Sequence, residues 1–154
     1  MRCEHQWQHR EVAMRCMDDT EVRLGRLRFA ERHLAEDQDD GRLFFLVEIA
    51  APGLLARLEG ATNLADGMGL SCFLGGLDYR GWEGEKRWRS ADRDIAVVAR
   101  WTVGGHIELE WTLRPWRTSE TGEWSASVAT VVEAGAEKDA LVAELHNFLA
   151  VERG

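Results

Sequence analysis

The sequence predicts an α+β fold in which antiparallel strands are followed by a helix in each half of the chain. Three observations predict it: segments of β-forming residues, short glycine-containing turns between them, and two segments with apolar residues at helical spacing. The expected order is βββα followed by βββα, with the C-terminal helix packed on the sheet. The 154 residues fit a single domain, and residues 1–11 are expected to form a flexible N-terminus.

In the first half, the turn signal Ala51-Pro52-Gly53 separates two segments rich in β-forming residues. Proline presets φ at its position and glycine accepts a positive φ after it, so a hairpin is expected here. Apolar residues at Leu70, Phe73, Leu74 and Leu77 follow the i, i+3, i+4, i+7 spacing of one helical face. The predicted elements are strands at 20–29, 43–50 and 54–59, an aspartate-rich loop at 30–42 and a helix at 64–77.

The second half predicts strands at 94–103, 106–113 and 123–133 and a helix at 136–151. The helix has an apolar stripe formed by Leu141, Leu145, Phe148 and Leu149. Between the first two strands, a three-residue turn of Val103-Gly104-Gly105 makes one face of the hairpin apolar, which a two-residue turn on the glycines would not. The expected pairs are Trp101 with Ile107, Ala99 with Leu109, Val97 with Trp111, and Arg100 with Glu108.

The net charge of −8 argues against nucleic acid as a partner, because phosphate binding depends on lysine and arginine contacts. It argues equally against an anionic membrane surface. A basic protein partner is compatible with this charge, as is the plain alternative that the charge keeps the domain soluble. No nucleic acid and no membrane are therefore expected as partners.

Cysteine usage indicates a reduced compartment. Cys3, Cys16 and Cys72 are odd in number and lack the spacing of a disulfide framework or a zinc site. The N-terminus has no apolar stretch typical of a signal peptide, and no window is long and apolar enough for a membrane helix. We expect a cytoplasmic protein with no cofactor.

The sequence gives no positive sign of catalysis. It contains no nucleophile elbow, phosphate-binding loop or dinucleotide fingerprint. His106, Glu108 and Glu110 alternate along one predicted strand and share a face, where they could hold a divalent ion. The alternative is a solvated strand face in which Glu108 pairs with Arg100.

Tryptophan is unusually frequent, with seven residues. Trp101 and Trp111 fall on the predicted core face. The others of interest lie in polar, loop-like contexts rich in arginine. Tryptophan and arginine are enriched at binding hot spots, but they also stack on each other and lock loops onto a sheet. The candidate binding residues are Trp82, Trp88, Trp116, Arg80 and Arg114.

Several short motifs resemble a bacterial family of uncharacterised small domains, over about residues 20–150. They are Asp78-Tyr79-Arg80-Gly81-Trp82-Glu83-Gly84, Gly105-His106-Ile107, Trp111-Thr112-Leu113-Arg114-Pro115-Trp116 and Gly122-Glu123-Trp124-Ser125-Ala126-Ser127. More distantly, the order of elements is similar to that of WapI-type immunity proteins. That resemblance implies a cytoplasmic protein that binds and neutralises a cognate toxin, and it assigns no individual binding residue.

We therefore expect a non-catalytic protein-binding domain, in its most specific form an immunity protein that occludes a basic toxin. Two alternatives stay open. One is a small-molecule-binding domain with tryptophan and arginine lining a cleft between sheet and helix. The other is a metal-assisted enzyme using His106, Glu108 and Glu110. The chain is expected to be a monomer or a homodimer, since an exposed sheet edge can pair with a second copy.

Overall fold

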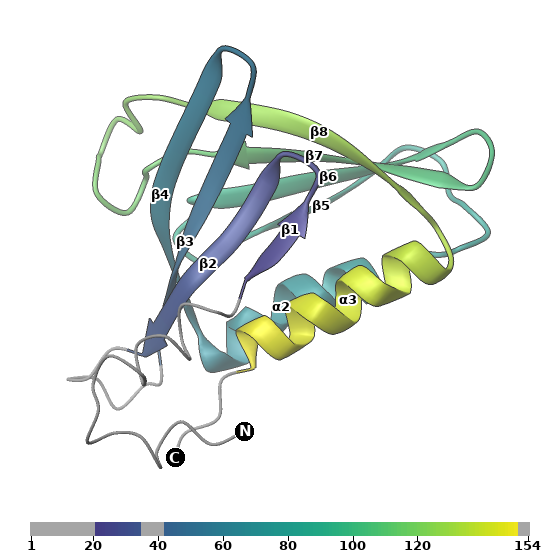
Figure 1. Cartoon of the computed structure of the whole chain (residues 1–154), viewed down its shortest axis with the longest axis horizontal. Coiled ribbons are helices and arrows are strands. Elements are labelled where there is room, and N and C mark those ends of the chain that lie inside the picture. The colour runs from purple at the N-terminus through teal and green to yellow at the C-terminus, as the bar shows by residue number, and fades with distance from the viewer. Residues whose placement is uncertain (1–20, 35–41, 151–154) are drawn as a thin grey trace.

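The protein forms two antiparallel four-stranded sheets, each followed by a helix (Figure 1). The computed structural model describes residues 21–34 and 42–150. Strand order in both sheets follows chain order, so each sheet is an up-and-down meander. The first half comprises β1 (Val22–Leu24), β2 (Leu27–Leu34), β3 (Arg42–Ala51), β4 (Leu54–Asn63) and α2 (Leu64–Gly75). The second comprises β5 (Glu85–Arg89), β6 (Ile95–Thr102), β7 (His106–Leu113), β8 (Ala126–Glu133) and α3 (Ala136–Leu149).

The α+β class is confirmed, but each half contains one strand more than the sequence predicts. Segment 20–29, predicted as one strand, contains a turn at Gly25, whose φ of +58° favours glycine, and β2 then continues to Leu34 into the predicted loop. Strand β5, predicted as loop, pairs with β6 along its whole length. Its only apolar residue is Trp88, so its sequence shows no apolar alternation. The predicted flexible segment 1–11 lies outside the described residues.

Both predicted glycine turns are present. In the β3–β4 hairpin, Ala51 pairs with Leu54 across Pro52-Gly53, and Gly53 has a φ of +77°. The three-residue loop between β6 and β7 is also confirmed. Its predicted register holds throughout, with Trp101 opposite Ile107, Ala99 opposite Leu109, Val97 opposite Trp111 and Arg100 opposite Glu108. The apolar face of this hairpin therefore faces the core, as the alternation requires.

Phe29 lies where the two sheets and the C-terminal helix meet. Its ring is 5.8 Å from that of Phe45 on the same sheet, 5.9 Å from Trp111 on the other sheet and 6.1 Å from Phe148 on α3. All four residues are buried. The inner faces of both sheets and one face of α3 thus share a single core.

Helix α3 is joined to β8 by a reciprocal cap. The Glu133 carboxylate accepts hydrogen bonds from the N–H groups of Gly135 (2.9 Å) and Glu137 (3.3 Å), which lower the pKa of Glu133. In return, the Glu137 side chain accepts the N–H of Glu133 at 2.8 Å. The predicted apolar stripe of α3 is buried against the core. In the described parts of the chain, no helix has both the length and the apolar character needed to span a membrane.

Candidate binding surfaces

The loop of residues 114–122, which follows β7, is held by its own arginine and tryptophan side chains. The guanidinium carbon of Arg114 lies 4.4 Å from the centre of the Trp116 ring, and that of Arg93 lies 5.5 Å from it. Arg114 also donates to the carbonyls of Thr121 (3.0 Å) and Gly122 (3.2 Å). These contacts close the 114–122 loop on itself, so Trp116 and Arg114 serve the loop's own structure.

A buried aspartate anchors the same loop to the sheets. Asp94 is 2% exposed and accepts the N–H of Arg117 at 2.8 Å. Burial raises the pKa of Asp94 above its ordinary value. The Arg117 guanidinium reaches strand β4, where it donates to the Glu59 carbonyl (3.1 Å) and lies 5.3 Å from the Phe44 ring. The loop therefore covers part of the β4 edge.

Trp88 lies on a strand, which corrects the prediction of a loop position. It lies on β5, opposite Val97 of β6, and is partly buried against the core. A Cβ placed on Gly69 of α2 would lie 3.4 Å from the Trp88 indole nitrogen. Trp88 thus fills the space between the β5 edge and α2.

Trp82 and Arg80 belong to a rigid turn between α2 and β5, residues 78–84, which we call the aromatic turn. Asp78 accepts the N–H of Arg80 at 2.8 Å through its side chain and the N–H of Gly81 at 3.0 Å through its carbonyl. The Arg80 N–H is the largest cause of the lowered pKa of Asp78. Gly81 has a φ of +102° and lies directly on the Trp101 indole, since an added Cβ would be 2.7 Å from that ring.

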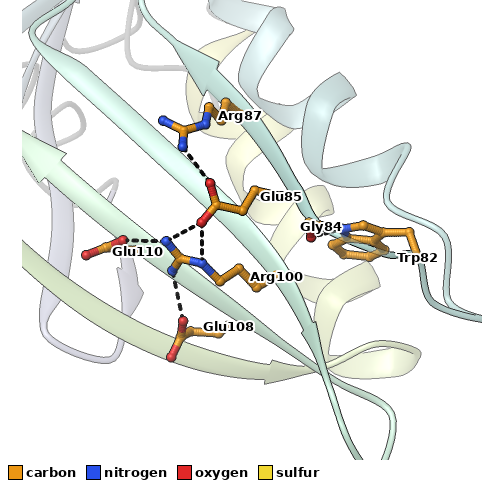
Figure 2. A network of polar contacts seen from close by, with 7 residues as sticks. All are labelled: Trp82, Gly84, Glu85, Arg87, Arg100, Glu108 and Glu110. Atoms are coloured by element: carbon orange, nitrogen blue, oxygen red, sulfur yellow. Dashed lines mark hydrogen bonds and ion pairs between the residues drawn. The ribbon is translucent and has the colours of Figure 1, made fainter.

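The aromatic turn combines one anchored ring with one exposed ring. The ring centres of Trp82 and Trp101 lie 5.9 Å apart. The Trp82 indole N–H donates to the Gly84 carbonyl at 3.2 Å, and Figure 2 shows these two residues. Lys86 lies 5.1 Å from the centre of the Trp82 ring. Tyr79, by contrast, is 66% exposed, and the guanidinium carbon of Arg80 lies 5.6 Å from the centre of its ring. The turn therefore presents Tyr79 and Arg80 to solvent from a fixed backbone.

The structure thus divides the five predicted binding residues among three places. Arg80 and Trp82 lie together in the aromatic turn, Trp88 lies on β5 and faces α2, and Arg114 and Trp116 stabilise the 114–122 loop. Sequence reasoning missed Tyr79 as a candidate because it selected for tryptophan. Its position within a glycine-flanked motif beside Arg80 was the available signal.

Among the described residues, helix α3 adjoins several grooves whose linings contain no tryptophan. A groove of about 500 Å³ lies between β1, β8 and α3, with Arg23, Arg26, Glu137 and Glu144 among its lining residues. A second groove, of about 600 Å³, lies beside Tyr79 between the end of α2 and the start of α3. A groove of about 420 Å³ is lined by Trp88 with Arg87 and Arg89, but its other lining residues are those of β6, so it lies on the sheet and not between sheet and helix as expected.

The predicted metal-ligand candidates lie on the solvent face of the second sheet. Glu108 and Glu110 accept hydrogen bonds from Arg100 at 3.0 and 3.1 Å, and Glu85 accepts one at 2.7 Å (Figure 2). These bonds raise the pKa of Arg100 and, together with Arg87, lower that of Glu85. Within residues 21–34 and 42–150, no three or more His, Cys, Asp or Glu side chains are placed to hold a metal ion. Glu108 and Glu110 instead accept hydrogen bonds from the Arg100 guanidinium.

A family model described as a family of unknown function, DUF6228, matches residues 15–152, so the chain belongs to that family. No functionally curated protein matches the sequence. Among solved structures, the fold is similar to WHY1 from Arabidopsis thaliana, with a TM-score of 0.42 and 10% identity over 84% of this chain and 86% of that chain. It is also similar to the plant transcriptional regulator PBF-2, with a TM-score of 0.42 and 8% identity over 84% and 78%.

One of these comparisons corrects an expectation drawn from the net charge. A chain with a similar arrangement of elements is a transcriptional regulator, and the exclusion of nucleic acid as a partner is therefore withdrawn. At this TM-score the likeness assigns no activity to the present chain. Nothing in the comparisons concerns immunity proteins.

Proposed function

We propose that this member of the DUF6228 family is a non-catalytic protein-binding domain that contacts its partner through the aromatic turn. The observation that carries the proposal is the exposure of Tyr79, at 66%, on a turn whose backbone is fixed from within. Tyrosine, tryptophan and arginine dominate binding hot spots, and here Tyr79, Trp82 and Arg80 lie within four consecutive residues.

Preorganisation supports this use of the turn. The Asp78 side chain and carbonyl hold the backbone at Arg80 and Gly81, and the Trp101 ring supports Gly81 from below. A partner would therefore bind Tyr79 without ordering a flexible loop, which is one of the main costs of association.

The adjacent groove gives a partner side chain a place to enter. It runs from Tyr79 to Gly135 and includes Lys138, whose ammonium is buried and donates to the Leu77 carbonyl at 2.6 Å. An ammonium has three donors, and Asp78 and Asp139 also line the groove, so a partner side chain would meet charges of both signs there. Exposed ring and neighbouring groove together resemble the anchor-and-pocket arrangement of protein interfaces.

Site-specific crosslinking tests the proposal directly. Tyr79→p-benzoylphenylalanine places a photo-reactive group on the turn, and the same change at Leu55, which is 67% exposed on β4, is the matched control. The expected result is a discrete protein adduct from position 79 and none from position 55. Equal labelling at both positions, or adducts with nucleic acid from position 79, would overturn the proposal.

A narrower form of the proposal is that the partner is a toxin that the domain neutralises. Its support is the resemblance in short motifs and element order to WapI-type immunity proteins, together with the acidic net charge of −8. Co-expression of the crosslinked partner in a test host would show growth arrest, relieved by the wild-type domain and not by Tyr79→Ala/Arg80→Ala. A partner that is harmless to the host would remove this narrower form and leave protein binding intact.

A further inference from the structure

The two sheets have four edges, of which three are short or covered. Strand β1 has three residues, and β5 has five, three of them basic (Lys86, Arg87 and Arg89). At the edge of β4, the Arg117 side chain donates a hydrogen bond to the Glu59 carbonyl. Short strands, lysine or arginine side chains and covering loops are the usual ways in which proteins protect sheet edges from further pairing.

Strand β8 has none of these protections. It is eight residues long, and residues 126–132 contain no charged side chain and no proline. Val131 on this strand is 57% exposed, one of four large hydrophobic side chains exposed to that degree among the described residues. An unprotected edge of this length is a template for strand pairing.

The ladder with β7 identifies the free backbone groups. Ala134 N–H donates to the Gly105 carbonyl at 2.9 Å, which fixes one hydrogen-bonded pair. Such pairs alternate along an antiparallel ladder. In steps of two from Ala134, the residues of β8 that bond to β7 are the even-numbered ones. The N–H and C=O groups of Ser127, Ala129 and Val131 therefore face away from β7, and all three residues are exposed.

The groove of about 500 Å³ lies beside this same edge. It is lined by residues 129–132 of β8, by Arg23 of β1 and Arg26 of the β1–β2 turn, and by Glu137 and Glu144 of α3. Arg26 and Glu144 make no ion pair or side-chain hydrogen bond within the described residues. A strand paired with β8 would therefore place alternate side chains near the Arg26 guanidinium and the Glu144 carboxylate.

A second observation points to an occupant of the groove. Thr130 lines it and is only 7% exposed, and its buried hydroxyl has no hydrogen-bond partner among the described residues. A buried hydroxyl without a partner is costly. A molecule in the groove that reaches this hydroxyl would remove that cost.

We propose that β8 binds an extended peptide segment of another protein by strand addition, with alternate side chains of the segment entering this groove. The segment carries an apolar residue toward the groove, flanked by an acidic residue for Arg26 and a basic residue for Glu144. A second copy of β8 does not fit this role. Its inward-facing residues, such as Thr130 and Val132, are already buried in its own core, and its own α3 occupies that side of the sheet.

Display of random peptides of about ten residues, enough to span β8 at ~3.3 Å per residue, supplies the probe. Selected peptides are then measured by titration against wild type and Val131→Pro, which removes one free-edge N–H and leaves the β7 ladder intact. Val131→Thr keeps that N–H and is the matched control. The expected result is binding weakened about tenfold or more by proline and unchanged by threonine.

Amide hydrogen exchange of the wild-type protein provides a measurement that does not depend on the variants folding. Bound peptide should slow exchange at Ser127, Ala129 and Val131 specifically. Arg26→Ala and Glu144→Ala should each weaken binding, whereas Tyr79→Ala/Arg80→Ala should not, which separates this site from the aromatic turn. Failure to select any peptide, protection elsewhere, or slow exchange at β8 caused by self-association would overturn the proposal.

Discussion

The aromatic turn and the 114–122 loop share a composition but differ in what their side chains contact. Both contain tryptophan, arginine and glycine. In the 114–122 loop, Arg114 is used by the Trp116 ring and by two carbonyls of the loop itself. In the aromatic turn, Arg80 pairs with Asp78 at 3.3 Å and lies beside the Tyr79 ring, but both Tyr79 and Arg80 stay exposed to solvent. Hot-spot composition therefore identifies a binding surface only when its side chains have not already been used internally.

The most severe test of the turn's rigidity is Gly81→Ala. Its Cβ would lie 2.7 Å from the Trp101 ring, and its φ of +102° is strained for any other residue. We expect a loss of about 3 kcal/mol in the free energy of unfolding, from overpacking plus backbone strain. Chemical denaturation measures it. Gly84→Ala, with φ of +80° and no atom within 4 Å of the added Cβ, is the control and should lose only about 1 kcal/mol. Equal losses would mean that the Trp101 contact is unimportant.

Arg114→Ala tests the structural role of the 114–122 loop. It removes two hydrogen bonds to carbonyls and the contact with Trp116. We expect a loss of about 2 kcal/mol in stability and no change in partner affinity. Denaturant titration and binding measurements on the same samples check both halves of the prediction. A loss of affinity without a loss of stability would show that Arg114 contacts the partner.

Tyr79→Ala/Arg80→Ala should give the opposite result. Both side chains are exposed, so the free energy of unfolding should change by no more than about 0.5 kcal/mol. Affinity for the crosslinked partner should fall about 30-fold, as for a hot spot worth ~2 kcal/mol. Leu55→Ala, an equally exposed site on β4, is the matched control and should leave affinity unchanged. Unchanged affinity in the double variant would contradict the proposed function.

Asp78, which holds the aromatic turn, and Asp94, which anchors the 114–122 loop, have opposite pKa shifts. Hydrogen bonds from Arg80 lower the pKa of Asp78, so its contribution to stability is present above its unfolded pKa and is lost as the pH falls through the folded value. Burial raises the pKa of Asp94, so its charge costs stability at neutral pH and that cost disappears as acid protonates it. Carbon-detected NMR titration of the carboxyl groups should show Asp94 protonating first as the pH is lowered. Asp94→Asn should remove its part of the pH dependence.

Periodicity predicted those parts of the fold in which alternation and turn chemistry agree. The β6–β7 register follows from one choice, a three-residue turn, because only that choice puts Trp101 and Ile107 on one face. Strand β5 could not be predicted in this way, because a single apolar residue shows no alternation. Its strand conformation depends on pairing with β6. At the candidate site, sequence could identify tryptophan and arginine but not their partners. The stacking of Arg114 on Trp116 and the support of Gly81 by Trp101 are tertiary contacts.

The position of Phe29 has a consequence for how the chain can be divided. The two ββββα halves look like separable units in sequence order, yet Phe29 of the first half packs on Trp111 and Phe148 of the second. Each half expressed alone would leave one side of that aromatic cluster in water, a loss that a small domain of marginal stability does not tolerate. The halves are therefore cooperative in unfolding. Split fragments of this protein would regain structure only by reassociating, which makes the domain suited to fragment complementation.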